Sequence, residues 1–155
     1  MLEIIIPTYN RPAMLAKTLR FLEISKVDCA IHVADGSTPE NAERNARTIM
    51  RAKNDIQVLH HPYPSEIPMY QRIALVTEKL SARYILLHAD DDFLFFDAAQ
   101  KCVSFLERHP LYVCCQGPMI TCFINRPAES RLHPYLTNPY VESTAVGRVK
   151  RMLYQ

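Results

Sequence analysis

Three consecutive carboxylates are the feature of this sequence that most clearly suggests chemistry. Asp90, Asp91 and Asp92 come two residues after the apolar run of residues 84–87, and aromatic residues follow them closely. Like charges placed side by side repel each other, and carboxylates held near an apolar core lose hydration. The sequence therefore predicts that a cationic partner binds at this cluster.

Two other polar motifs follow apolar runs in the same way. The segment PTYNR spans residues 7–11, and the segment ADGS spans residues 34–37. In an open α/β sheet, ligands collect beyond the carboxyl ends of the strands, where the strand order reverses. We therefore expect the three motifs to lie together at one edge of such a sheet.

A phosphate group that binds at this edge would need ligands other than the N–H groups of a glycine-rich loop. The chain has three glycines, and neither a dinucleotide-binding turn after the first strand nor a P-loop is present in the sequence. Hard divalent cations take oxygen ligands and usually share them with substrate phosphates. The residues therefore favour a divalent cation held by the aspartates.

Alternating strands and helices must position these motifs. Pro12 and Pro39 are typical of a first helical position, and Thr38 is a predicted N-cap. Apolar residues continue with helical period to Met50 in the second helix and begin at Met69 in the third. The alternation predicts an α/β fold with a mostly parallel central sheet. The predicted strands are residues 2–6, 30–34, 56–59 and 84–87, and a fourth helix is expected at about residues 97–109.

The remaining segments have weaker patterns. Residues 60–68, which include the adjacent His60 and His61, are a predicted loop. Beyond Pro110, the segments YVCC (112–115) and MITCFI (119–124) are predicted strands. The basic segment at residues 146–155 is a predicted helix with a solvated face, and its contact with a membrane is at most peripheral.

Composition is that of an ordinary globular protein. The 155 residues are 48% apolar and 22% charged, which suits one domain with a sizeable core. The net charge of +2 gives no indication of nucleic-acid binding, and no apolar run approaches the roughly 18 residues needed to span a bilayer. The five cysteines form no C-x-x-C pair and lie in or beside apolar segments. Buried, reduced thiols and a cytoplasmic location are therefore predicted.

Three segments together resemble a known family. IIIPTYNRPAMLAKTLRFL, then VADGS, then YILLHADDD are similar, in that order, to the nucleotide-binding half of a family 2 glycosyltransferase. The resemblance implies a GT-A-like three-layer α/β/α sandwich with a mostly parallel, Rossmann-like central sheet. It assigns residues 1–124 to a nucleotide-sugar-binding GT-A domain. Residues 125–155 are then the incomplete start of an acceptor-side region or a C-terminal tail.

The resemblance also implies roles for individual residues. Asp35 would accept a hydrogen bond from the base, Arg72 would face the diphosphate, and Asp90 would meet the ribose. Aligned on the family's aspartate cluster, Asp91 is the ligand of Mn²⁺ or Mg²⁺, and Asp92 is the alternative ligand if the three aspartates are read directly as D-x-D. His88 stands where the family usually has another aspartate. The residues along the uracil and ribose would be Pro7, Thr8, Tyr9 and Arg11.

The implied reaction is metal-dependent, inverting transfer of a sugar from a nucleotide sugar, with a UDP-sugar favoured, to a saccharide or other hydroxyl acceptor. Negative charge grows on the leaving diphosphate, and the cation and Arg72 would stabilise it. A carboxylate base must also deprotonate the acceptor. In the family this base follows the metal site, and the late carboxylates here are Glu129 and Glu142, of which Glu142 is kept as the candidate catalytic residue.

Neither late carboxylate has a context that resembles the family's base motif. The chain is therefore expected to be a truncated transferase whose isolated activity is slow hydrolysis. A nucleotide-binding module without turnover is the alternative function. A phosphatase with an aspartate nucleophile fits less well, because its carboxylate would follow the first strand rather than the fourth.

Overall fold

The computed structural model describes residues 1–117, 119–123, 125–133, 144 and 146. These residues belong to two compact units, residues 1–113 and residues 114–155, and each unit is described by itself. No helix among the described residues is both long enough and apolar enough to cross a membrane.

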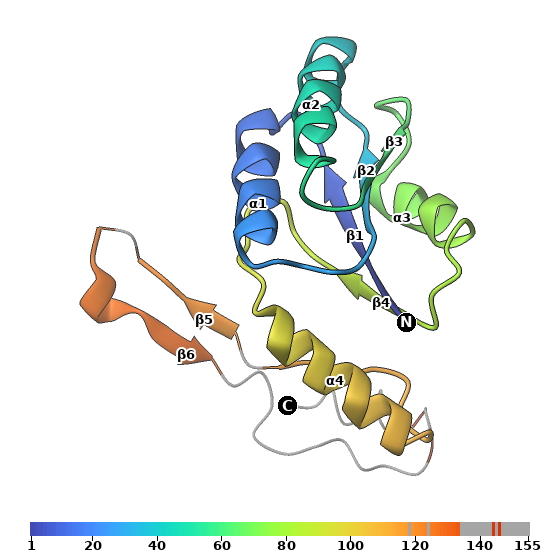
Figure 1. Ribbon diagram of the computed structural model, residues 1–155, viewed down its shortest axis with the longest axis vertical. Coiled ribbons are helices and arrows are strands. Elements are labelled where there is room, and N and C mark those ends of the chain that lie inside the picture. The colour runs from blue at the N-terminus through green and yellow to red at the C-terminus, as the bar shows by residue number, and fades with distance from the viewer. Residues whose placement is uncertain (118, 124, 134–143, 145, 147–155) are drawn as a thin grey trace. The chain divides into compact units, whose positions relative to one another are not determined.

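A parallel sheet of four strands forms the centre of the first unit (Figure 1). Its order is β3-β2-β1-β4, so the chain runs from β1 out to β3 and then crosses back to place β4 on the other side of β1. The pairing of β1 with β2 runs from Ile4↔Ile31 to Thr8↔Asp35, which brings the ends of these two strands level with each other. The strands are β1 (Leu2–Thr8), β2 (Ile31–Asp35), β3 (Val58–Pro62) and β4 (Tyr84–Leu87).

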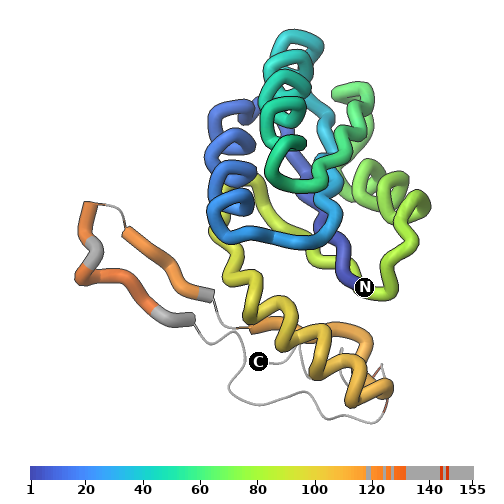
Figure 2. Tube along the Cα trace, viewed as in Figure 1, coloured from blue at the N-terminus to red at the C-terminus, as the bar shows by residue number. Residues whose placement is uncertain are grey.

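Helices cover both faces of this sheet, as the predicted three-layer arrangement requires. The tube in Figure 2 shows the chain alternating between strand and helix through the first unit. One core cluster joins α1 and α2 to side chains such as Ile4, Ile6 and Val33, and the opposite cluster joins Val76 of α3 to Ile5. The predicted α/β fold is therefore confirmed. The helices are α1 (Pro12–Ile24), α2 (Pro39–Ala52), α3 (Met69–Thr77) and α4 (Phe96–Arg108).

Local signals account for where the helices begin. Pro12 and Pro39 occupy the first turns of α1 and α2, where a missing N–H leaves no helical hydrogen bond unmade. Thr38 is the N-cap of α2, as predicted, but its side chain makes no capping hydrogen bond. Its hydroxyl donates to Asn10 Oδ1 instead, at 3.1 Å.

Several sequence predictions were wrong in detail. Met50 is 75% exposed and Met69 is 54% exposed, because the buried stripes of their helices run through Asn45 and Ile49 in α2 and through Arg72 and Val76 in α3. The third strand begins and ends later than predicted, because its pairing with β2 continues to Asp35↔Pro62. His60 and His61 are thus strand residues rather than loop residues.

The tail of the first unit and the cysteines also differ from expectation. Residues 112–115 form no strand. None of the five cysteines is buried; Cys114 and Cys122 are exposed and the others are half-buried. Apolar neighbours along the chain therefore did not place these thiols in the core.

The second unit is small among its described residues. An antiparallel pair joins β5 (Met119–Thr121) to β6 (Arg131–His133), so only the first half of the predicted strand at residues 119–124 forms. A short 3₁₀ helix, η1 (Pro127–Glu129), lies between them. Glu142 and most of the basic segment at residues 146–155 lie outside the described residues.

Candidate functional site

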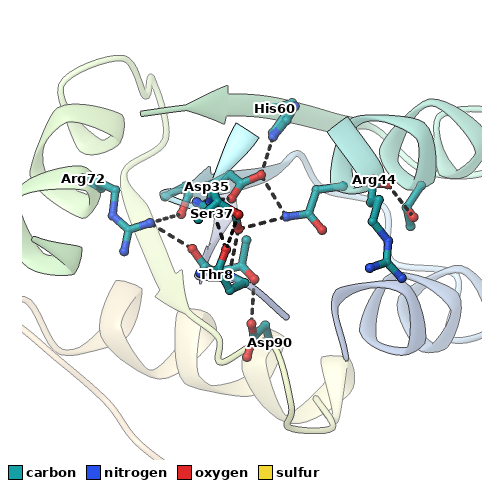
Figure 3. Close-up of polar contacts among 12 residues, drawn as sticks. Thr8, Asp35, Ser37, Arg44, His60, Arg72 and Asp90 are labelled. Carbon is teal, nitrogen blue, oxygen red and sulfur yellow. Dashed lines mark hydrogen bonds and ion pairs between the residues drawn. The ribbon is translucent and has the colours of Figure 1, made fainter. Parts of the chain in front are cut away.

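Polar side chains from three loops gather where β1, β2 and β4 end (Figure 3). The loops follow β1 (residues 9–11), β2 (residues 36–38) and β4 (residues 88–95). Because β1 lies between β2 and β4, this edge is the point where the strand order reverses, which is where open α/β sheets bind ligands. The three motifs singled out in the sequence therefore do meet.

Asp90 is the most firmly held carboxylate of the aspartate cluster. Its Oδ2 accepts a 2.6 Å hydrogen bond from the Thr8 hydroxyl, and its Oδ1 lies 2.8 Å from Arg11 Nη1. Its backbone carbonyl accepts a 2.7 Å hydrogen bond from the buried Thr18 hydroxyl of α1. The Asp90 side chain is only 5% exposed, so one strand end and one helix fix it before any ligand binds.

Asp91 and Asp92 lie further out. Asp91 Oδ2 is 2.8 Å from Arg11 Nη2, and the Asp91 side chain is 40% exposed. Asp92 is exposed as well. The predicted cationic partner of the cluster is thus an arginine of the chain itself. The Coulombic attraction of Asp90, followed by the hydrogen bond to Asp91, raises the pKa of Arg11.

Asp91 and Asp92 suit a cation site whose ligands come partly from a bound substrate and water, rather than a site made entirely of protein side chains. No cluster of three or more His, Cys, Asp or Glu side chains suited to a metal ion occurs within the described part of the chain. A small divalent cation is commonly bound by one or two carboxylates together with substrate phosphates and water. Two accessible carboxylates beside a fixed third one fit that kind of site.

Asp35 occupies the centre of a second network. It is fully buried and accepts hydrogen bonds from the Ser37 N–H, Asn45 Nδ2 and His60 Nε2, each at 2.9 Å. Burial alone would raise the pKa of Asp35, but the bonds from His60, Ser37 and Asn45 outweigh it and lower the pKa to about 2. These three donors hold Asp35 as a buried anion.

Asn10 joins the first loop to the second. Its backbone φ of 54° lies in the left-handed region, which asparagine adopts more readily than most residues. Its N–H donates to Ser37 Oγ at 2.8 Å, and its Oδ1 accepts from the Thr38 N–H at 2.9 Å and from Asn41 Nδ2 at 3.2 Å. The two loops are therefore fixed to each other through one side chain.

Arg72 approaches this edge from α3 (Figure 3). It is 4% exposed, and its Nη1 donates to the carbonyl of Thr8 at 2.9 Å, while its buried Nε has no partner among the described residues. Burial lowers the pKa of Arg72, and the nearby Asp35 opposes this effect. The guanidinium lies against Gly36, where an added Cβ would be 1.9 Å from Nη1. A buried cation with unused donors therefore lies beside the two loops.

The other predicted residues are placed as follows. Pro7 is half-buried at the end of β1, and Tyr9 is 49% exposed. His88 is 6% exposed, and its Nε2 has no hydrogen-bond partner within the part of the chain that the structure describes. Burial lowers the pKa of His88, and Asp92 and Asp91 oppose that shift. Glu129, in the second unit, is paired with Arg126 at 3.0 Å.

Sequence reasoning missed residues that hold the site residues in place through hydrogen bonds. Asn45 is a polar residue inside the apolar stripe of α2, and this interruption was the signal that could have identified it. His60 required the register of β3, which pairs it with Val33 two residues before Asp35. Thr18 gave no signal, and Asn10 was given no role although it lies in the PTYNR motif, because the partners of both residues lie far away in the sequence.

Comparison with known proteins identifies the family of this chain. The model of the family described as glycosyl transferase family 2 matches residues 3–150. No curated protein matched the chain. The matched region includes all three loops of the site and extends over nearly the whole sequence. The chain therefore belongs to glycosyl transferase family 2.

Proposed function

We propose that this chain transfers a sugar from a nucleotide-sugar donor, a UDP-sugar, to a saccharide or other hydroxyl acceptor, with a divalent cation and with inversion at the sugar. The observation that carries the proposal is the sharing of Asp90 between Thr8 at the end of β1 and Arg11 at the N-cap of α1, with Asp91 and Asp92 exposed beside it. This combination supplies a fixed carboxylate, two accessible carboxylates and a cation at one strand edge.

The nucleoside is proposed to lie over the first two loops. Pro7, Thr8 and Tyr9 would line the uracil and ribose, with Asp35 toward the base and Asp90 toward the ribose. Asp35 is already bound by three donors, and a carboxylate has about four lone-pair positions. A base N–H would therefore take the remaining position or replace one of the present donors.

The diphosphate is proposed to lie toward the arginines and the outer aspartates. Asp91, with Asp92 as the alternative, would hold Mn²⁺ or Mg²⁺, which when bound supplies positive charge to the leaving diphosphate. Within the described part of the chain, the Arg72 guanidinium donates from Nη1, to the carbonyls of Thr8 and Ala34, and its buried Nε has no partner there. A positioned guanidinium stabilises charge that develops on a leaving group without reorganising during the reaction.

Thr8 and Thr18 contribute by holding the aspartate loop in place. Each donates to Asp90, one to its carboxylate and one to its carbonyl. Positioning of this kind lowers the entropic cost of reaching the reactive geometry.

The cytoplasm, or the cytoplasmic face of a membrane, stays the proposed location.

Calorimetry of UDP binding tests the proposal. UDP should bind in the presence of Mn²⁺ and much more weakly after chelation, because the diphosphate charge then loses its partner. Uridine, which lacks the diphosphate, should show no such dependence on the metal. Equal affinity for UDP with and without Mn²⁺ would contradict the proposed cation site.

A matched pair of variants tests whether the Mn²⁺ dependence of UDP binding arises at Asp91. Asp91→Asn removes charge from the proposed ligand and should weaken Mn²⁺-dependent UDP binding. Asp97→Asn, an exposed aspartate in the first turn of α4, makes the same change away from the cluster and should leave UDP binding intact. Equal effects of the two variants would remove Asp91 from the site.

A further inference from the structure

Arg11 spans two of the three aspartates with one guanidinium. Its Nη1 lies 2.8 Å from Asp90 Oδ1, and its Nη2 lies 2.8 Å from Asp91 Oδ2. Within the described residues, no other cation lies within ion-pair distance of Asp90, Asp91 or Asp92. The planar fork of arginine suits such a bridge, whereas the ammonium of lysine is a single point charge.

The two bridged carboxylates are held very differently. Asp90 is 5% exposed and also accepts hydrogen bonds from Thr8 and Thr18, neither of which involves Arg11. Asp91 is 40% exposed, and Arg11 is its only side-chain partner in the described part of the chain. The contact between Arg11 and Asp91 is therefore the one that can break without disturbing the rest of the loop.

We propose that Arg11 is a positioning residue that occupies Asp91 in place of the divalent cation and is released when the cation and the diphosphate bind. This inference rests on the proposed function. Two cations on one carboxylate repel each other, so a cation that binds Asp91 favours release of the Nη2 arm of Arg11. The Arg11 side chain is 49% exposed, so this arm can turn into solvent while Nη1 stays on Asp90.

A coupling between cation and nucleotide follows from this exchange. A cation that binds alone must break an existing ion pair and leaves one arm of Arg11 without an anion. A diphosphate that binds at the same time offers that arm new oxygen acceptors, because guanidinium and phosphate pair readily. Each ligand should therefore strengthen the binding of the other, and by thermodynamic linkage the factor is the same in both directions.

Mn²⁺ titration without nucleotide tests the exchange, with free Mn²⁺ measured by electron paramagnetic resonance. Arg11→Gln should bind Mn²⁺ up to about 5-fold more tightly than the wild type, because an exposed ion pair no longer competes for Asp91. Arg20→Gln removes an arginine of α1 whose partner is Glu23, and it should leave Mn²⁺ affinity unchanged. UDP should strengthen Mn²⁺ binding less in Arg11→Gln than in the wild type.

The opposite results overturn the proposal. Mn²⁺ affinity that is unchanged or weaker in Arg11→Gln, or undetectable in both proteins, shows that Arg11 does not compete for the site. If circular dichroism shows that Arg11→Gln does not fold, Arg11→Lys replaces it. The lysine keeps the charge but loses the bridge, so Mn²⁺ should bind more tightly than in the wild type by a smaller factor. An unchanged or weaker affinity in that variant again overturns the inference.

The two proposals fail in distinguishable ways. If UDP binds with Mn²⁺ but Arg11→Gln leaves Mn²⁺ affinity unchanged, the proposed function stands and the exchange by Arg11 is wrong. If Arg11→Gln binds Mn²⁺ more tightly but UDP binds no protein, the exchange at the cation site stands and the nucleotide-sugar function is wrong.

Discussion

Replacing Gly36 by alanine should destabilise the first unit by displacing the guanidinium of Arg72. A Cβ on Gly36 would lie 1.9 Å from Nη1, 2.3 Å from Cζ and 2.8 Å from Nε of Arg72. All three distances are far below van der Waals contact, so the whole guanidinium must move. The 2.9 Å hydrogen bond from Nη1 to the carbonyl of Thr8 is then lost.

The size of the effect follows from two opposing contributions. A hydrogen bond from a charged donor stabilises a protein by about 1.5–3 kcal/mol. A change from glycine to alanine at a tolerant position stabilises by about 0.4–1 kcal/mol, because the unfolded chain loses freedom. The expected net loss is therefore about 1–2 kcal/mol. With a urea dependence typical of small proteins, the unfolding midpoint should fall by roughly 0.5–1 M.

Urea unfolding of four proteins tests this reasoning: the wild type, Gly36→Ala, Arg72→Met and the double variant. Gly36→Ala should cost stability in the wild-type background and little or nothing in the Arg72→Met background, because the obstacle is gone. Gly117→Ala serves as a control for the substitution itself, since a Cβ there meets nothing within 4 Å. The same loss from Gly36→Ala in both backgrounds would refute the account.

Two further predictions concern acid and the aspartate loop. The pKa of His61 is lowered to about 4 by burial and by neighbouring positive charges, so stability should fall as pH drops from 6.5 to 4, where only the unfolded His61 gains a proton. A second fall should follow below pH 4, since the pKa of Asp35 is about 2 when folded and 3.8 ordinarily. Urea midpoints at several pH values should show both, and an undiminished first fall in His61→Gln would contradict the first. Thr18→Val should cost about 1–3 kcal/mol by leaving the buried carbonyl of Asp90 without its donor. Thr48→Val, which alters an exposed hydroxyl, should cost less than about 0.5 kcal/mol, and equal losses in a urea melt would argue against the Thr18 bond.

The sheet and the meeting of the three loops could be predicted from sequence because they depend on local periodicity. Short apolar runs alternating with helical repeats require parallel pairing, and parallel pairing brings the strand ends to one edge. The presence of PTYNR, ADGS and the aspartates at that edge then followed without knowledge of any contact. Their roles toward a nucleotide sugar stay predictions.

The identity of the aspartates' partner could not be predicted. The sequence favoured a divalent cation at the aspartates and gave no sign of Arg11 there, because Arg11 and Asp90 are separated by 79 positions and their pairing depends on the order of the strands. His60 was hidden for a related reason. It lies in β3 at the edge of the sheet, where polar residues are tolerated and the apolar pattern that marks a strand fades.

The bonds of Asn10 have a consequence for the thermodynamics of ligand capture. Because this side chain ties the first loop to the second through Thr38 and Asn41, the free protein already has these two loops in one arrangement. The conformational entropy of these loops was therefore already lost when the chain folded, and a ligand that contacts both loops does not have to order them again. Binding there should release heat with little entropic opposition from the backbone, and association should be limited by encounter rather than by loop rearrangement.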